Sequence, residues 1–148
     1  MPSSNPKTIL VVGGLENQLA NCLQEVFRHA LFRYFNWSMR QLRTCHEALA
    51  FLRQNPVPLV ISGCEMPDGN WKDLLRQLPL LTKPPLLAVS YQPTGRCFWS
   101  EVISLGGYDV LVKPFRVPDI FRTLSLAWET WKDRNRSAGV GSLSKLSV

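Results

Sequence analysis

The sequence lacks any hydrophobic run long enough to cross a membrane. The longest apolar stretches, such as Ile9–Val12 and Leu86–Val89, are short, whereas a membrane-spanning helix needs about 20 apolar residues. The N-terminal segment Met1–Lys7 also lacks the charged region, the apolar region and the small-residue cleavage site of a secretory signal. These absences predict a soluble protein with a cytoplasmic location.

Metal-binding and redox motifs are missing as well. The four cysteines, Cys22, Cys45, Cys64 and Cys97, form no C-x-x-C pair, and the chain has only two histidines. This pattern argues against a zinc site and favours reduced, mostly buried thiols. Of the four, Cys64 is the one that we single out as a candidate for reactivity.

The sequence shows no sign of a catalytic centre. No nucleophile and base stand in a recognisable pattern, and Gly13-Gly14 does not extend to the G-x-G-x-x-G motif of dinucleotide-binding proteins. We therefore expect no catalytic residue, no cofactor and no enzymatic activity.

No dense basic run is present either, although the 17 Lys and Arg residues outnumber the 11 Asp and Glu residues and give a net charge of +6. The arginines are scattered, which favours a solvated surface over a nucleic-acid site. A basic protein associated with nucleic acid or another polyanion remains the alternative, and its affinity would fall steeply with salt.

What the chain does contain is five alternating strand and helix patterns within 148 residues, 45% of them hydrophobic, which suit one domain. The predicted strands are 8–12, 37–42, 59–62, 86–90 and 108–112. The predicted helices are 17–35, 44–52, 71–78, 98–105 and one that Pro118 opens and that carries apolar residues as far as Trp131. Because the strands are apolar enough to be covered on both faces, they predict a parallel sheet in a doubly wound α/β fold.

Local signals mark several helix ends. Thr44 and Glu47 have the spacing of a capping box, and Gly106-Gly107 predicts a helix terminus. We expect residues 1–6 to be an N-terminal extension, residues 7–133 to form the domain, and the Ser/Gly-rich residues 134–148 to be a flexible C-terminal tail.

Three motifs carry a resemblance to a known family. They are Glu47-Ala48-Leu49 in the second helix, Met66-Pro67 after the third strand, and Leu111-Val112-Lys113-Pro114-Phe115 at the fifth strand. Together they resemble the receiver domains of response regulators in two-component phosphorelay signal transduction. The resemblance covers the chain from Lys7 to about Trp131 and implies a flavodoxin-like (βα)5 fold with strand order 2-1-3-4-5.

The chain departs from that family at its phosphorylation site. The resemblance implies a phosphoacceptor Asp four residues before Pro67, and Gly63 stands there. It also implies two acidic metal ligands after the first strand, where the chain has Gly13 and Gly14. Glycine supplies no carboxylate, so we expect no magnesium site of the family type and no phosphoryl acceptor. Glu16 and Glu65 remain as ordinary solvated glutamates or as one carboxylate ligand each.

Other positions of the family's site are retained or changed. The resemblance matches Ser90 to the hydroxyl residue at the end of the fourth strand and Lys113 to the basic residue that pairs with the phosphoryl group. Val110 stands at the aromatic switch position. We expect the emptied pocket to be either a weak anion site, with Lys113 and the backbone N–H groups of the glycines as donors, or a polar dimple in which Lys113 pairs with Glu65 or points to water.

These observations favour a stand-alone degenerate receiver domain, a pseudo-response regulator that works through protein–protein interaction without phosphorylation. The resemblance implies a partner or self-association surface on the fourth helix, fifth strand and fifth helix. Large aromatic residues in these segments point to the same face; the candidates are Trp99, Tyr108, Trp128 and Trp131.

Overall fold

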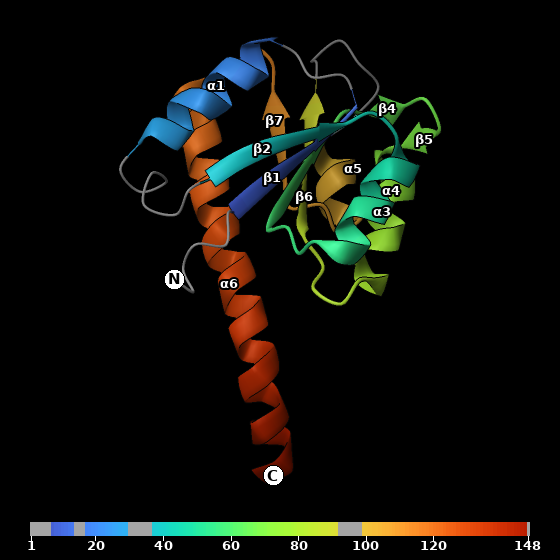
Figure 1. The fold of residues 1–148 in the computed structure, drawn as a ribbon, viewed down its shortest axis with the longest axis vertical. Coiled ribbons are helices and arrows are strands. Elements are labelled where there is room, and N and C mark those ends of the chain that lie inside the picture. The colour runs from blue at the N-terminus through green and yellow to red at the C-terminus, as the bar shows by residue number, and fades with distance from the viewer. Residues whose placement is uncertain (1–6, 14–16, 30–36, 92–98, 148) are drawn as a thin grey trace.

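Five parallel strands form one sheet in the computed structural model, which describes residues 7–13, 17–29, 37–91 and 99–147 (Figure 1). The strands are β1 (Lys7–Val12), β2 (Trp37–Leu42), β3 (Leu59–Ser62), β6 (Leu86–Tyr91) and β7 (Asp109–Val112). Their order in the sheet is β2-β1-β3-β6-β7, and all neighbouring pairs are parallel. Counted along the chain, this is the order 2-1-3-4-5, so the predicted doubly wound fold is confirmed.

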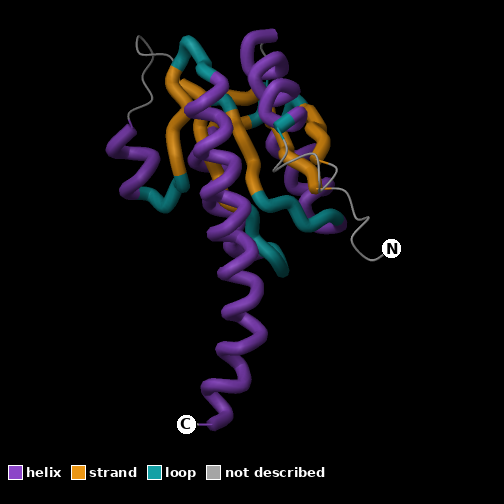
Figure 2. The backbone as a smooth tube through the Cα atoms, turned by 90° about the vertical axis from the view of Figure 1, so that its left-hand side faces the viewer, coloured by secondary structure: helices purple, strands orange, loops and turns teal. Residues whose placement is uncertain are grey.

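Helices cover both faces of the sheet (Figure 2). They enclose two apolar layers. The helices α1 (Asn17–Arg28) and α6 (Val117–Ser147) pack over one face. The opposite layer receives α3 (Cys45–Gln54), α4 (Trp71–Gln77) and α5 (Trp99–Ser104). Alternate residues of β1 enter the two layers: Ile9 and Val11 face α1, and Leu10 and Val12 face α3. This alternation explains why the central strands are apolar throughout.

The predicted caps are present. The Thr44 side chain accepts a hydrogen bond of 3.0 Å from the Glu47 backbone N–H, and the Glu47 carboxylate accepts from the Thr44 backbone N–H. After α5, Gly106 has a φ of +106°, and the Gly107 N–H donates to the Val102 carbonyl at 2.8 Å. A Cβ on Gly107 would lie 2.5 Å from the Val102 side chain, so this helix end requires the absence of a side chain.

The first helix is shorter than predicted. It ends at Arg28 rather than at Phe35, and the His29 N–H closes the last turn on the Val26 carbonyl at 3.0 Å. The six residues of β1 span about 20 Å, and the 12 residues of α1 return over about 18 Å. A helix that continued to Phe35 would extend beyond the point at which β2 begins, because Trp37 pairs with Lys7 at the start of β1. Residues 30–36 lie outside the described part of the chain.

The last helix is longer than predicted. Where the sequence suggested a frayed end beyond Arg134, α6 continues to Ser147 and projects past the sheet (Figures 1 and 2). The segment contains no proline, and each added residue extends an existing helix by one hydrogen bond without a new nucleation step. Its two glycines, Gly139 and Gly141, weaken the helix but do not end it.

The Met-Pro loop also contains regular structure that the sequence did not reveal. Two short antiparallel strands, β4 (Glu65–Met66) and β5 (Gly69–Asn70), form a hairpin around Pro67 and Asp68. A 3-10 helix, η2 (Leu78–Leu80), follows α4. In the described parts of the chain, no helix combines the length and the apolar character that a membrane crossing would need.

Candidate functional site

The carboxyl ends of β1 and β3 bring Gly13 and Gly63 together. A Cβ on Gly13 would lie 3.8 Å from the backbone nitrogen of Gly63. Gly13 has a φ of +100°, a conformation that residues with a side chain rarely adopt, whereas a Cβ on Gly63 would meet only the Glu65 carbonyl oxygen, at 3.8 Å. A Cβ therefore fits at Gly63, whereas any side chain is strained at Gly13. Gly14 lies outside the described residues.

The backbone N–H groups of both glycines already have carbonyl acceptors. The Gly13 N–H donates to the Leu42 carbonyl at 2.8 Å, and the Gly63 N–H donates to the Val12 carbonyl at 3.1 Å. The Gln41 side-chain amide also donates to the Gly13 carbonyl at 3.1 Å. The anion site expected from the sequence needed these two N–H groups as donors, so that expectation is wrong for Gly13 and Gly63. Sheet formation, which aligns N–H and carbonyl groups of neighbouring strands, is the physical reason.

Met66 fills the space beside Gly13. Its side chain is buried, and its Cγ and Sδ atoms would both lie 3.7 Å from a Cβ on Gly13. A flexible thioether packs well into an irregular gap but is a poor ligand for a hard cation such as magnesium. Glu65 is exposed, and no cluster of three or more His, Cys, Asp or Glu side chains suited to a metal occurs in the described residues. Glu16 lies outside them.

The retained positions line the neighbouring strand ends. The Cys64 thiol donates a long hydrogen bond of 3.6 Å to the Ser90 carbonyl, so Ser90 adjoins the segment that follows Gly63. Lys113 is half-buried, follows β7 and precedes Pro114 across a cis peptide bond. Val110 is buried in the layer on the α3 side, at the predicted switch position.

Ser62 is a site residue that sequence reasoning missed. It immediately precedes Gly63 and is fully buried, and its hydroxyl has no hydrogen-bond partner within the described structure. A hydroxyl at the end of an otherwise apolar strand, Leu59-Val60-Ile61, was the available signal.

Asp68, also missed, ties the hairpin after β3 to the start of α3. Its two carboxylate oxygens accept hydrogen bonds from the backbone N–H groups of Cys45 and His46, at 2.8 and 3.0 Å. These two bonds lower the pKa of Asp68 below its ordinary value. Burial, followed by the nearby charges of Asp68 and Asp73, raises the pKa of the Cys45 thiol to about 11. The start of α3 is therefore closed to an external anion.

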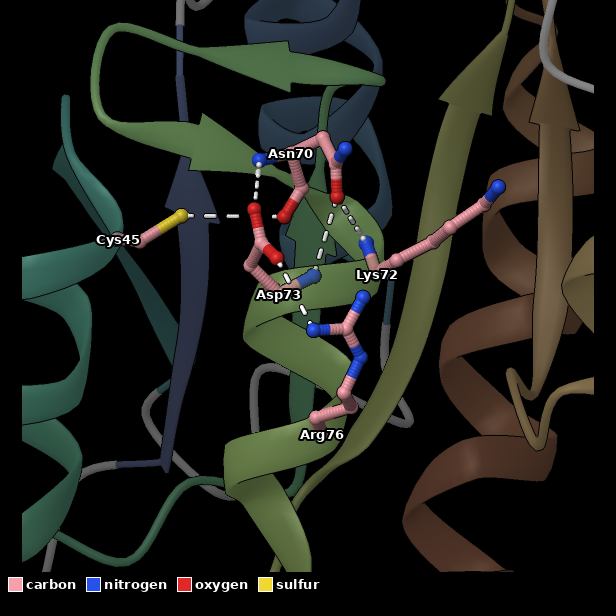
Figure 3. Close-up of polar contacts among 5 residues, drawn as sticks. All are labelled: Cys45, Asn70, Lys72, Asp73 and Arg76. Atoms are coloured by element: carbon pink, nitrogen blue, oxygen red, sulfur yellow. Dashed lines mark hydrogen bonds and ion pairs between the residues drawn. The ribbon is translucent and has the colours of Figure 1, made fainter.

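A second capping box joins the same hairpin to α4 (Figure 3). The Asn70 side-chain oxygen accepts from the backbone N–H groups of Lys72 and Asp73, at 2.9 and 3.1 Å. In return the Asp73 carboxylate accepts from the Asn70 N–H at 3.0 Å and pairs with Arg76 at 3.3 Å. The spacing of Asn70 and Asp73 was the sequence signal for this cap. The segment between Gly63 and α4 is thus anchored at both ends.

Three described cysteines have free thiols, as expected. Cys22 and Cys45 are buried and Cys64 is half-buried, whereas Cys97 lies outside the described residues. Burial, followed by the charge of Glu25, raises the pKa of Cys22. The first two thiols are therefore protonated and shielded at neutral pH.

The four candidate aromatics do not share one surface. Trp99 on α5 is 58% exposed, and Tyr108 and Trp131 are half-buried against the core beneath α1 and α6. Trp128 packs edge-on against Trp37, at 5.3 Å between ring centroids, and stacks on Trp131 at 5.9 Å.

Trp128 is also held between two cations. Lys7 and Lys132 place their ammonium groups 4.9 and 5.1 Å from its ring centroid. Because Trp37 lies on β2, at the opposite edge of the sheet from β7, Trp128 belongs to the other flank of α6 from the predicted interaction face.

Sequence comparison finds no matching family model and no matching curated protein. Solved structures are nevertheless similar. A response regulator receiver domain protein from Clostridium thermocellum has a TM-score of 0.64 at 19% identity, over 85% of this chain and 97% of that one. The chemotaxis response regulator CheY4 of Vibrio cholerae has a TM-score of 0.63 at 17% identity, over 83% and 99%. An adenylate cyclase structure from Rhodopirellula baltica has a TM-score of 0.73 at 16% identity, over 93% and 98%.

These likenesses define the class of structure. The chain is a flavodoxin-like α/β protein, and within that class it has the fold of response-regulator receiver domains. The resemblance carried by Met66-Pro67 and Lys113-Pro114 is confirmed at the level of the fold. At these sequence identities the similarity establishes the fold and does not establish the activity.

Proposed function

We propose that this protein is a degenerate receiver domain that acts in signal transduction through protein contacts, without phosphoryl transfer. The observation that carries the proposal is the pair Gly13 and Gly63 at the carboxyl ends of β1 and β3, with Met66 packed beside Gly13. A phosphoaspartate needs a carboxylate nucleophile and a cation that offsets the charge of the incoming phosphoryl group. Neither glycine can contribute to this chemistry.

The position of Val110 supports the same conclusion. A switch that follows phosphorylation requires two arrangements of a side chain with different free energies in the two states. Val110 is buried and β-branched, so its side chain has few rotamers and no ring to move. The protein therefore acts as a binding module with one resting conformation, and we assign it no enzymatic activity.

The surface proposed for a partner is formed by α5, β7 and α6. Several of the large apolar side chains that the structure exposes lie on these elements: Trp99, Ile103, Val112 and Leu126. Trp99 and Ile103 are one helical turn apart on α5 and therefore lie on the same side of the helix. Exposed aromatic and aliphatic residues on one face favour a protein partner over water. In this proposal Trp99 is the anchor, and Trp128 is not part of the surface.

The alternative of a polyanion-binding protein gains no specific support from the arrangement of charges. Several cations pair with nearby carboxylates, and these pairs are distributed over several helices, so the positive charge is not concentrated in one place. These pairs are Arg28–Glu25, Lys72–Glu101, Arg76–Asp73, Arg122–Asp119 and Lys132–Glu129.

The direct test is incubation with acetyl phosphate and magnesium followed by intact-mass measurement. We expect no phosphate adduct on the native chain. The variant Gly63→Asp is compatible with the backbone at this position. It is expected to accept at most a trace of phosphate, because Gly13 and Gly14 still provide no carboxylate ligand for magnesium. A stable single-phosphate adduct on the native protein would refute the proposal. Affinity capture with native protein and with Trp99→Ala tests the partner surface, since the variant is expected to lose the bound protein.

A further inference from the structure

A groove lies between the second half of α3 and the segment that follows α4. It has a volume of about 260 Å³ and is lined by Leu49, Arg53, Gln77, Leu80, Leu81 and Thr82. Figure 1 shows α3 and α4 side by side on one face of the sheet. Because α3 begins just after the carboxyl end of β2, its second half lies toward the amino ends of the strands, away from Gly13 and Gly63. The groove is therefore separate from the site described above.

Leucines give the groove an apolar floor and rim. Leu49 and Leu81 are half-buried and pack on the core beneath α3 and α4, whereas Leu80 is 78% exposed. Leu80 is exposed because it lies in the 3-10 turn η2, in which Leu78 is buried in the core and Leu80 points outward. An exposed leucine beside an apolar hollow is a surface on which a second apolar side chain loses its contact with water.

The charged side chain that lines the groove is Arg53, and the next residue after the lining is the cation Lys83. In the described structure neither cation forms an ion pair or a hydrogen bond. The acidic groups on the flanking helices are engaged elsewhere. The Glu47 carboxylate accepts hydrogen bonds at the start of α3, and the Asp73 carboxylate is held by Asn70 and Arg76. The groove therefore complements carboxylates of a partner.

From this combination we infer that the groove binds an acidic peptide segment of a partner protein, with one large apolar side chain inserted between Leu49 and Leu80 and with flanking carboxylates on Arg53 and Lys83. The volume is below the range of about 300–1,000 Å³ usual for small-molecule pockets and suits a single anchoring side chain. This contact is distinct from the surface on α5, β7 and α6, so it stands or falls independently of the proposed function.

The test uses the full chain labelled with ¹⁵N and short synthetic peptides, followed by NMR. A peptide with a central leucine between glutamates is expected to shift the amide signals of Leu49, Arg53, Leu80 and Leu81 saturably, with a dissociation constant of about 1 mM or tighter. Peptides with a central alanine, or with lysines in place of the glutamates, are expected to bind at least tenfold more weakly.

Matched variants locate the site. Leu80→Ser and Arg53→Glu alter exposed side chains and are expected to weaken binding about tenfold or more. Leu105→Ser and Arg43→Glu make the same changes at exposed positions elsewhere and are expected to leave binding unchanged. The inference is overturned if no saturable shift occurs at millimolar peptide, if the alanine and leucine peptides bind equally, or if a single-stranded oligonucleotide produces the same shifts. A sedimentation coefficient that falls on Leu80→Ser would identify a second copy as the occupant and would likewise overturn it.

Discussion

The thioether of Met66 packs beside Gly13, with Cγ and Sδ each 3.7 Å from the point at which a Cβ would stand. This contact makes the surroundings of Gly13 apolar. The receiver-type position after β1 thereby becomes part of the packed core, and the hairpin that carries Met66 is held in place by Asp68 and Asn70. The strand ends around Gly13 and Gly63 are therefore held in place by packing and by backbone hydrogen bonds.

Acidic substitutions at the two glycines are expected to differ in cost. Gly13→Asp forces a side chain into a φ of +100° and should lower the free energy of unfolding by about 1–3 kcal/mol. Gly63→Asp meets only one carbonyl oxygen at ordinary contact distance and should cost less. Urea denaturation of both variants measures the difference, with Gly13→Ala and Gly63→Ala as controls for charge. Equal losses at the two positions would contradict the assigned backbone strain.

Removal of two buried hydroxyl groups should have opposite effects on stability. The Thr123 hydroxyl donates to the Asp109 carboxylate at 2.8 Å and is buried. Thr123→Val should lower the free energy of unfolding by about 1.5–3 kcal/mol, because a bond to a charged group is lost. Ser62→Ala removes a buried hydroxyl that has no partner in the described structure and should be neutral or stabilising by up to about 1 kcal/mol. Thermal unfolding resolves the two effects, and a large loss for Ser62→Ala would show that its hydroxyl is engaged.

Acid should release the hairpin from α3. The pKa of Asp68 is lowered by the N–H groups of Cys45 and His46, so its carboxylate stabilises the fold above the ordinary carboxyl pKa of about 4. This contribution is lost as the pH falls through the lowered pKa of the folded state. We expect the stability difference between native protein and Asp68→Asn to be largest near neutral pH and to shrink below about pH 4. Urea midpoints between pH 7 and pH 3 measure it, with Glu65→Gln as the control.

The two flanks of the protein should respond differently to loss of a tryptophan. Trp128 contacts Trp37, Trp131, Lys7 and Lys132, and Trp128→Ala should cost about 2–4 kcal/mol, somewhat less than full burial would imply. Trp99→Ala changes a side chain that is 58% exposed and should stay within about 0.5 kcal/mol of the native value. Urea denaturation followed by circular dichroism compares them. A large loss for Trp99→Ala would remove it from the proposed surface.

Much of the fold was determined by signals that act within a few residues. The apolar run Leu59–Ser62 predicted its strand without error, and Thr44 with Glu47 predicted the start of α3. Gly106-Gly107 predicted the end of α5, because a tight turn there leaves no room for a side chain. The motifs around Met66-Pro67 and Lys113-Pro114 pointed to the strand order through the family resemblance. The absence of a carboxylate at Gly13 and Gly63 is visible in the sequence itself.

What only the tertiary structure decided was how these distant segments meet. Gly13 donates to Leu42, Asp68 holds the amides of Cys45 and His46, and Trp128 packs on Trp37. None of these partners is near in sequence, so neither periodicity nor capping rules could identify them. The first two follow from parallel pairing, which brings the carboxyl ends of separate strands to one edge of the sheet and commits backbone N–H groups to neighbouring carbonyls. The third follows from the packing of α6 on the apolar layer that contains Trp37. Because of the parallel pairing, the N–H groups of Gly13 and Gly63 donate to strand carbonyls and are not available to an anion, and Met66 packs beside Gly13.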